Sequence, residues 1–361
     1  MSANRRVFLE STAAATAAAA LQTHSVWAAE GKSNVNFALV GLGSLSTHQI
    51  APALQKTKHA KLVGIVTGTP DKERIWADKY GIEKQNIYNY ENFDKLADNE
   101  AIDVVYIVLP NSMHKEFTIR GAQAGKHVLC EKPMANSSAD CQAMIDACQT
   151  HNRKLAIGYR CQFEPHHLHC RDLARSGKYG PLKVIEAGFG FKIGDPNQWR
   201  LKADLAGGGA LMDVGIYALQ ACRFLTGEEP VAITAQETKT DSKKFAEVDE
   251  TITWTMTTAS GVNCYCSTSY AFGGINRFNA YAEKGSFGLD PAYSYDGIRG
   301  KSSDGPLELP QVDQFATEMD AFAKCILEDR QSSVPGEEGL RDLLAIEAIY
   351  ESIRTGRRVD L

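Results

Sequence analysis

The stretch VNFALVGLGSLS, residues 35–46, decides the fold of the first half of the chain. Its apolar start (35–40) predicts a buried strand, and Gly41-Leu42-Gly43 follows where a helical segment begins. Glycines in such a strand–turn–helix unit allow a tight turn and let the backbone approach a pyrophosphate at the helix N-terminus. Ser46 stands in place of the usual third glycine or alanine and is still small. The motif predicts a dinucleotide-binding domain.

Further apolar runs recur after this motif, separated by segments of helix length, at 61–66, 102–110, 126–130 and 154–159. Strand–helix alternation over 34–158 predicts an α/β Rossmann domain, that is, a doubly wound parallel sheet.

The pattern changes after residue 159. Helical stretches at 164–177 and 207–226 precede alternating, β-branched runs at 230–239, 248–257, 261–270 and 276–290. Helical segments at 311–329 and 337–356 end the chain. Residues 159–361 are therefore expected to form an α+β domain with a large, mainly antiparallel open sheet, for substrate binding and oligomerisation.

Residues 1–29 have the tripartite pattern of a signal peptide. Arg5-Arg6-Val7-Phe8-Leu9 resembles the twin-arginine export motif, a weakly apolar stretch follows, and Val26 and Ala28 suit the −3 and −1 places of a cleavage site. The alternative is an amphipathic helix, but an alanine run without a polar face makes a poor one. We expect periplasmic export of a folded, cofactor-loaded protein and removal of the signal.

The composition excludes some classes of protein. Of 361 residues, 39 are Lys or Arg and 44 are Asp or Glu, which gives a net charge of −5. A nucleic-acid-binding protein would normally show a basic stripe, and none is present. A membrane-spanning helix needs about 20 apolar residues. The alanine-rich run near the N-terminus is shorter, so we expect no transmembrane segment.

The nine cysteines are an odd number and show no C-x-x-C spacing. We therefore expect mostly buried free thiols and no zinc site. A metal site is an alternative at His166, His167, His169 and Cys170, because position 166 shares a helical face with 169 or 170. These residues open an ordinary helix, and we expect no metal.

The end of the second apolar run bears on the choice between NAD and NADP. An NAD enzyme normally places a carboxylate there for the ribose 2′-hydroxyl. This chain has Thr67, Gly68 and Lys72 around that point instead, which favours NADP because a hydroxyl, a backbone amide and a cation can bind a 2′-phosphate. The alternative is an ordinary polar loop before a helix.

Taken together, the later motifs resemble the Gfo/Idh/MocA family of oxidoreductases, and within it the exported glucose–fructose and aldose–aldose oxidoreductase branch. The motifs are Leu109-Pro110-Asn111-Ser112-Met113-His114, Cys130-Glu131-Lys132-Pro133, Gly158-Tyr159-Arg160, Gln198-Trp199-Arg200-Leu201 and the glycine-led segment 207–217. The branch carries a long N-terminal arm that ties a tetramer, whereas only residues 29–34 remain here. We expect a homodimer built by packing the exposed faces of the C-terminal sheets.

The resemblance implies a role for individual residues. Those implied to bind the cofactor or border the cleft are Gly41, Gly43, Ser44, Leu45, Thr67, Gly68, Lys72, Tyr90, Leu109, Asn111, His114, Glu131, Lys132, Arg160, Trp199 and Arg200. Those implied to be catalytic are Lys132, Asp213 and Tyr217, where Tyr217 replaces the histidine of many members.

Oxidation of a sugar hemiacetal needs a base for the C1 hydroxyl proton. Tyr217 can serve if its pKa falls from about 10, and a nearby Lys132 ammonium would lower it. Asp213 lies four residues earlier, on the same helical face. Each residue also has a plain structural interpretation: Lys132 as a solvated turn residue, Tyr217 as core packing and Asp213 as a helix cap.

These observations favour an NADP-dependent enzyme with a tightly bound cofactor that oxidises an aldose to its lactone and reduces a second sugar to the alditol. A cofactor that stays bound would make the reaction ping-pong. The alternatives are a conventional sugar dehydrogenase with exchangeable NADP, and a non-catalytic NADP-binding sugar sensor. Small-molecule sugars are the expected partners.

Overall fold

The computed structural model describes residues 33–361, so the expected signal peptide lies outside the described residues. Within this range, the first sheet has six parallel strands in the order β3-β2-β1-β4-β5-β6. The strands are β1 (Val35–Val40), β2 (Ala60–Val66), β3 (Ile87–Tyr88), β4 (Val104–Ile107), β5 (His127–Glu131) and β6 (Leu155–Gly158). The direction of winding reverses between β1 and β4, which is where such sheets bind ligands. The predicted doubly wound parallel sheet is confirmed.

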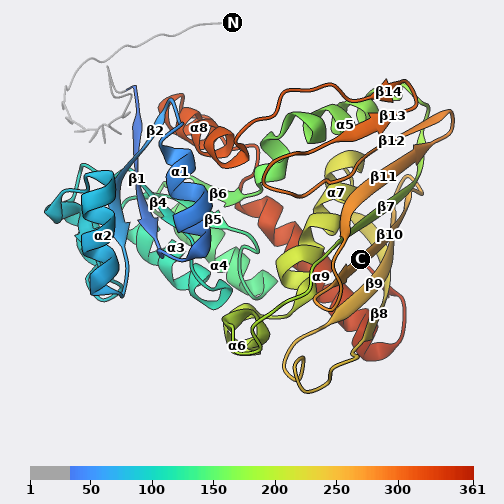
Figure 1. Ribbon diagram of the computed structural model, residues 1–361, viewed down its shortest axis with the longest axis horizontal. Helices are drawn as coiled ribbons and strands as arrows, with labels where there is room; N and C mark the ends of the chain where they lie inside the picture. Colours follow the sequence, from blue (N-terminus) through green and yellow to red (C-terminus); the bar gives the residue numbers. More distant parts are fainter. Residues whose placement is uncertain (1–32) are drawn as a thin grey trace, which may run out of the picture. The chain divides into compact units, whose positions relative to one another are not determined.

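Helices connect the strands of this sheet (Figure 1). They are α1 (Ala51–Leu54), α2 (Pro70–Tyr80), α3 (His114–Gln123) and α4 (Ser138–Thr150). A π-helical turn, Ser46–Ile50, precedes α1 directly after the glycine motif. The sequence favours the start of α2 because Pro70 occupies its first turn and Asp71 and Glu73 complement the helix dipole.

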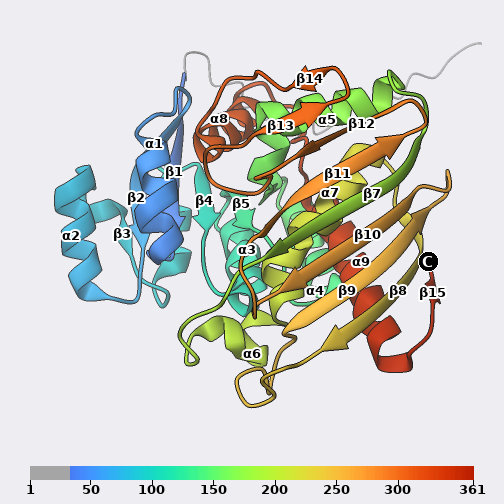
Figure 2. The same ribbon diagram turned by 45° about the vertical axis from the view of Figure 1, so that its right-hand side comes forward.

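The second sheet has nine strands in residues 33–361, in the order β14-β13-β12-β11-β7-β10-β9-β8-β15. They are β7 (Leu182–Gly190), β8 (Pro230–Thr238), β9 (Thr251–Thr258), β10 (Asn263–Ser269), β11 (Ile275–Ala282), β12 (Gly285–Leu289), β13 (Gly300–Ser302), β14 (Gly305–Pro306) and β15 (Val359–Asp360). All neighbouring pairs are antiparallel except β7 with β10. The expected mainly antiparallel open sheet is confirmed (Figure 2).

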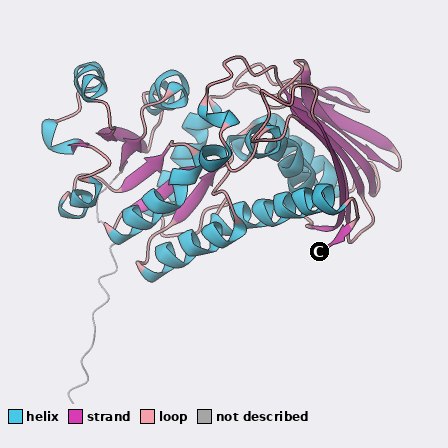
Figure 3. Ribbon diagram, turned by 90° about the horizontal axis from the view of Figure 1, so that it is seen from below, coloured by secondary structure: helices cyan, strands magenta, loops and turns pink. Residues whose placement is uncertain are grey.

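One face of the second sheet is covered by helices, and the other face carries none among residues 33–361 (Figure 3). The helices of this half are α5 (Pro165–Ser176), α6 (Ala203–Ala206), α7 (Ile216–Thr226), α8 (Gln314–Leu327) and α9 (Gly336–Thr355). Along β9 buried and outward positions alternate, because Ile252, Trp254 and Met256 face the core. Threonines take the outward positions between them.

Several details of the second sheet differ from the sequence expectation, among them the short strands β13, β14 and β15, which were not predicted. The run 276–290 is two strands, β11 and β12, joined at Glu283 and Lys284. Strand β7, near the middle of the sheet, was not predicted at all. Its sequence LKVIEAGFG mixes charged residues and glycines, and neighbouring strands supply the burial that its own pattern does not signal.

The last two helices also contact the first sheet. Helix α8 packs against α1, β1 and β2, and α9 packs along α4 as well as β8. A bridge between Ala156 and Pro335 extends the edge beside β6. Because these contacts join the two halves of the chain, the described residues form one compact unit.

One helical stretch of the described chain, Ala203–Thr226, is long and apolar enough to cross a membrane by composition. Its most apolar window is 72% buried inside the protein, as is usual for a core helix.

All nine cysteines are free thiols, and all are buried except Cys161, which is half-buried. This confirms the expectation of mostly buried free thiols. Cys264 and Cys266 share one face of β10, and Cys266 Sγ lies 3.6 Å from Cys222 Sγ on α7. Among residues 33–361 no group of three or more His, Cys, Asp or Glu side chains is placed to hold a metal ion.

Candidate active site

The glycine turn after β1 is shaped for close approach of a ligand. Gly41 has a φ of +94°, and a Cβ there would lie 2.4 Å from the backbone oxygen of Val108. At Gly43 a Cβ would meet nothing within 4 Å, so the backbone of this residue faces open space. Ser46 turns its hydroxyl inward and donates to Gly41 O at 2.6 Å. The serine therefore preserves the close packing that a third glycine usually provides.

Side chains around the turn suit an anionic group. Lys72 Nζ donates to Leu42 O at 2.9 Å, which places an ammonium over the glycine turn. Ser44 is exposed and Leu45 is half-buried, both at the start of the following helix. Backbone amides at a helix start and a lysine beside them are the groups that bind a pyrophosphate. The residues present therefore fit a dinucleotide.

The end of β2 differs in one respect from the sequence expectation. Thr67 is buried, at 2% exposure, and its hydroxyl accepts a bond from the Thr69 amide at 3.3 Å. Gly68 and Thr69 are exposed, and a Cβ on Gly68 would lie 3.0 Å from the Tyr90 ring. Tyr90 therefore borders this loop as expected, while the exposed polar positions are Gly68 and Thr69 rather than Thr67.

The segment after β4 is held by internal hydrogen bonds. His114 is 1% exposed, and its ring nitrogens lie 2.9 Å from the backbone oxygens of Leu109 and Pro133. Burial lowers the pKa of His114, although these carbonyls oppose the shift. Asn111 Nδ2 donates to Ala206 O at 2.8 Å. His114 thus ties the loop after β4 to the loop after β5, and its contacts are those of a positioning residue.

Glu131, the last residue of β5, belongs to a buried carboxylate pair. Tyr106 donates from its hydroxyl to Glu131 Oε1 at 2.7 Å and also lies 3.4 Å from Glu318 Oε2 on α8. Burial raises the pKa of both carboxyl groups, and their mutual repulsion raises that of Glu318 further. Tyr106 and Glu318 had no signal in the sequence, because α8 reaches this place only through the tertiary fold.

Lys132 and Asp213 meet at the centre of the site. Lys132 Nζ donates to Asp213 O at 2.6 Å and lies 3.5 Å from Asp213 Oδ1. Arg200 Nε and the Tyr270 hydroxyl donate to Asp213 Oδ2 at 3.1 and 2.8 Å. Burial opposes the charge of Asp213, but the Lys132 and Arg200 cations outweigh it and hold the pKa of this carboxyl below its usual range. Asp213 is therefore a carboxylate that positions two cations.

The helix that carries Asp213 is capped by another residue. Asp249 accepts from the amides of Gly209 and Leu211 at 2.7 and 2.8 Å. A Cβ on Gly209 would lie 2.1 Å from Asp249 O, so this glycine is needed for close packing. The helix-cap interpretation of Asp213 is therefore wrong, because Asp213 lies inside the π-helical turn Leu211–Gly215 and Asp249 fills that role.

Tyr217, at the start of α7, lies between two cations. Lys132 Nζ is 4.9 Å and Arg160 Cζ 5.0 Å from the centroid of its ring. Burial raises the pKa of Tyr217, and Arg160 opposes that shift. The Lys132 ammonium, which was expected to lower this pKa, is bonded to Asp213 and lies over the ring. Arg160 is the cation that favours the phenolate.

Arg160 is 2% exposed and is fixed by three acceptors. It donates to the backbone oxygens of Tyr293 and Ser294 at 2.6 and 3.2 Å, and to the side chain of Gln314 on α8. Its guanidinium also lies 4.7 Å from the centroid of the Tyr295 ring. Arg160 thus joins the end of β6, the loop after β12 and α8 beside Tyr217.

The structure brings Lys132, Asp213, Tyr217, Arg160 and Arg200 together. Trp199 lies against Arg200, whose guanidinium carbon is 4.5 Å from the indole centroid. Sequence reasoning missed the side chains that complete this group from distant segments, namely Tyr106, Tyr270, Tyr293, Tyr295, Gln314 and Glu318. All lie outside the motifs.

Two family models match the chain. The oxidoreductase family with an NAD-binding Rossmann fold matches residues 35–159, and the GFO/IDH/MocA C-terminal domain matches residues 167–288. The chain therefore belongs to the Gfo/Idh/MocA family of oxidoreductases, with a Rossmann domain of the NAD(P)-binding type, as the resemblance indicated.

Individual proteins similar to the chain include a solved structure of aldose-aldose oxidoreductase from Caulobacter crescentus complexed with glycerol. It is 44% identical, has a TM-score of 0.89, and the match covers 91% of this chain and 100% of that one. D-xylose 1-dehydrogenase (NADP(+)) of Haloarcula marismortui is 31% identical over 338 residues, 91% of this chain and 93% of its own length. A D-xylose 1-dehydrogenase of Haloferax volcanii is 28% identical over 333 residues, 90% and 99% of the two chains.

Proposed function

We propose that the protein is an NADP-dependent sugar oxidoreductase that oxidises an aldose to its lactone and reduces a second sugar to the alditol. The observation that carries this proposal is the grouping of Lys132, Asp213 and Tyr217 at the carboxyl end of β5. The 44% identity to an aldose-aldose oxidoreductase supports the substrate class.

Dinucleotide binding would involve the glycine turn from Gly41 to Leu45, with Lys72 and Gly68 toward a 2′-phosphate. The NADP(+) specificity printed for the relative from Haloarcula marismortui supports this cofactor. When bound, the nicotinamide ring supplies the hydride acceptor for one sugar and the hydride donor for the other. A tightly held cofactor would make the two sugars alternate in one pocket, in a ping-pong sequence.

The protein's own residues handle the proton. Tyr217 takes the proton of the sugar C1 hydroxyl in the oxidising direction and returns a proton to the carbonyl oxygen in the reducing direction. Burial favours the neutral phenol, which suits the reducing direction, and the nearby Arg160 cation assists its ionisation. Asp213 holds Lys132 and Arg200 so that both cations face the same space.

Export to the periplasm by the twin-arginine route belongs to this proposal and rests on Arg5-Arg6-Val7-Phe8-Leu9. A homodimer formed through the helix-free face of the second sheet also belongs to it. An exposed Tyr265, at 51%, lies on that face opposite Thr255 and Glu186.

The test is a spectrum of purified, dialysed protein before and after addition of glucose or xylose. Growth of absorbance in the reduced-nicotinamide band without added cofactor is expected, followed by its loss when a second sugar is added. The matched sample is the Tyr217→Phe protein, which should retain cofactor but respond slowly. A protein that holds cofactor and never reduces it with any aldose would instead be a sensor.

A conventional sugar dehydrogenase with exchangeable NADP is the second candidate function. The two D-xylose 1-dehydrogenases to which this chain is similar favour it. The same experiment on dialysed protein distinguishes the two candidate functions. Reduction that requires added NADP and gives free NADPH supports the dehydrogenase, because the retained-cofactor enzyme cannot release it each turnover.

A further inference from the structure

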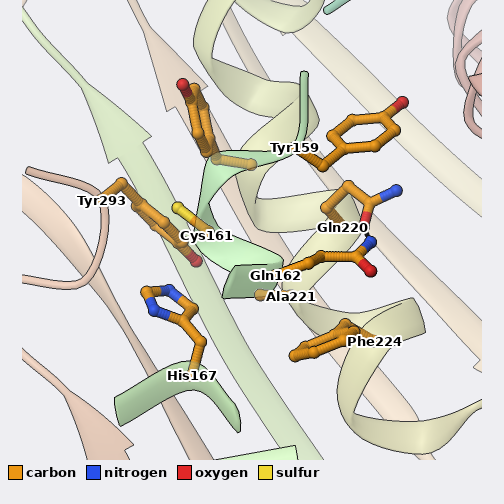
Figure 4. A pocket seen from close by; sticks show the side chains of 9 residues that line it. Tyr159, Cys161, Gln162, His167, Gln220, Ala221, Phe224 and Tyr293 are labelled. Carbon is orange, nitrogen blue, oxygen red and sulfur yellow. Dashed lines mark hydrogen bonds between the residues drawn. The ribbon is translucent and has the colours of Figure 1, made fainter. Parts of the chain in front are cut away.

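A small cavity behind Tyr217 contains chemistry that the sugar reaction does not use. It measures about 20 Å³, counted as space open to the centre of a water-sized molecule, so it holds one small solute. Its lining includes Cys161, His167, Tyr217, Gln220, Phe224 and Tyr293. Figure 4 shows Cys161, His167 and Tyr293 grouped on one side, across from Gln220 and Phe224.

Two polar atoms of this cavity are left without a partner. His167 Nε2 and the Tyr293 hydroxyl belong to side chains that are 3% and 2% exposed, and neither has a hydrogen-bond partner among residues 33–361. An unpaired buried polar group has lost its hydrogen bonds to water without replacement, which is unfavourable. Both atoms therefore indicate a small polar guest in the cavity.

His167 is oriented by a buried carboxylate. Glu164, the N-cap of α5, has its Oε2 2.9 Å from His167 Nδ1 and its Oε1 2.6 Å from His166 Nδ1. Burial opposes the charge on His167, but Cys161 and Glu164 outweigh it and raise the pKa of His167 to about 9. The protonated ring therefore presents Nε2–H to the cavity that Cys161 lines.

Cys161 differs from the other eight cysteines because it is not fully buried. Burial opposes its ionisation, but the positive charges of Arg160 and His167 outweigh it and lower the pKa of this thiol. Arg160 comes from the same turn as Cys161, and His167 comes from α5. Other ionisable side chains also interact electrostatically with the Cys161 thiol, namely Glu164, Glu318 on α8, Tyr217 on α7 and Tyr293. A thiol of lowered pKa beside a histidine that a carboxylate orients is the arrangement of an activated nucleophile.

We propose that Cys161 is a site of oxidation by hydrogen peroxide, with His167, held by Glu164, as the proton donor. The Cys161 sulfur attacks one peroxide oxygen, so that the S–O bond forms as the O–O bond breaks. The departing hydroxide takes the His167 proton and leaves as water. Sulfur is oxidised from thiolate to sulfenic acid, and peroxide is reduced. The cavity size selects a small oxidant, and the new oxygen lies beside Tyr217.

The experiment treats the whole protein with hydrogen peroxide and a dimedone probe for sulfenic acid, and follows each cysteine by peptide mass spectrometry. Cys161 should be labelled about tenfold or more faster than any other cysteine at pH 6, because its thiol pKa is lowered whereas the pKa of each of the other eight thiols is raised, chiefly by burial. tert-Butyl hydroperoxide, which is too large for the cavity, should label Cys161 at least about tenfold more slowly.

Variants identify the residues responsible. His167→Gln should slow labelling of Cys161 at pH 6 about tenfold, and Glu164→Gln should slow it in the same direction. Cys161→Ser should abolish the fast label, whereas Cys170→Ser, a buried thiol on the same helix as His167, should leave it unchanged.

The proposal would be overturned if Cys161 were labelled no faster than the other cysteines. It would also be overturned if Cys161 were labelled at the same rate in folded His167→Gln protein as in wild type. If a variant does not fold, the rates of Cys161 labelling by the two oxidants in the wild-type protein still test the proposal. The labelling does not involve sugar or cofactor, so its outcome is independent of the proposed oxidoreductase activity.

Discussion

Lys132 Nζ lies 2.6 Å from the backbone oxygen of Asp213, a residue 81 positions later in the chain. Lys132 follows the end of β5 in the first sheet, and Asp213 lies in the turn that leads into α7 against the second sheet. The contact therefore joins the nucleotide-binding half to the other half at the place where a sugar would react.

Asp213→Asn should lower sugar oxidation about 10²-fold or more, because the Lys132 and Arg200 cations lose the charge that positions them. Dinucleotide affinity, measured by fluorescence titration, should change little. The matched control is Asp204→Asn, an exposed residue of α6 just before the glycine-led segment. Equal rates in both variants would remove Asp213 from the catalytic machinery.

Tyr217→Phe should slow both half-reactions about 10²–10⁴-fold, the usual contribution of a general acid–base group. Stopped-flow spectroscopy of reduction and reoxidation of the bound cofactor measures each half. Tyr265→Phe, at an exposed tyrosine of β10, is the control. Near-normal rates in both halves would leave Tyr217 as packing alone.

The pH dependence of the two half-reactions should differ. Because burial raises the pKa of Tyr217, the phenol stays protonated through the neutral range. Oxidation, which needs the phenolate, should accelerate as pH rises between about 6 and 9, whereas reduction, which uses the phenol, should stay level. Parallel profiles for the two halves would contradict Tyr217 as the shared proton carrier.

Thr67→Asp should weaken NADP binding and favour NAD, because a carboxylate at the end of β2 would repel a 2′-phosphate. Thr67→Asn keeps the shape without the charge and separates repulsion from loss of packing at this buried position. Titration of both cofactors into apo-protein measures the ratio. An unchanged preference in Thr67→Asp would mean that the 2′-phosphate binds elsewhere.

Glu164→Gln should reduce the loss of stability in acid. The two histidines bonded to Glu164 overcome the effect of burial and lower the pKa of its carboxyl to about 2. A depressed folded-state pKa gives stability that is complete above the unfolded value near 4.5 and is lost as pH falls toward 2, on the order of 3 kcal/mol. Urea unfolding between about pH 5 and 2 should therefore be flatter in the variant than in wild type. Glu100→Gln, an exposed control, should follow the wild type.

Tyr265→Lys combined with Thr255→Lys should convert the proposed homodimer to monomer, because the two residues are cross-strand neighbours on the helix-free face of the sheet. Like charges would then meet across a two-fold interface. Light scattering measures the mass. A wild-type monomer, or a dimer that survives the double variant, would place the interface elsewhere.

The sequence by itself determined the architecture of the first half and predicted many of the residues that the structure brings together at the candidate site. Apolar runs at regular intervals specify parallel strands buried on both faces, and Gly41 and Gly43 mark the turn because few other residues tolerate such close backbone approach. The spacing of Asp213 and Tyr217 predicted one shared helical face, and the resemblance to the family implied that both lie with Lys132, where the structure has them. Local patterns carry this information because each element's periodicity reflects the face that it buries.

Only the tertiary structure decided the electrostatic environment of those residues and which further side chains complete the site. Strand β7 gave no sequence signal, since its neighbours supply its burial, and Glu318 reaches Tyr106 only because α8 returns to the first sheet. The pKa of Tyr217 depends on burial and on Arg160 beside its ring, and neither effect produces a periodic pattern in the sequence. Electrostatic interactions act through space between segments far apart in the chain, and so the environment of a residue, unlike its place in a strand or helix, follows only from the complete fold.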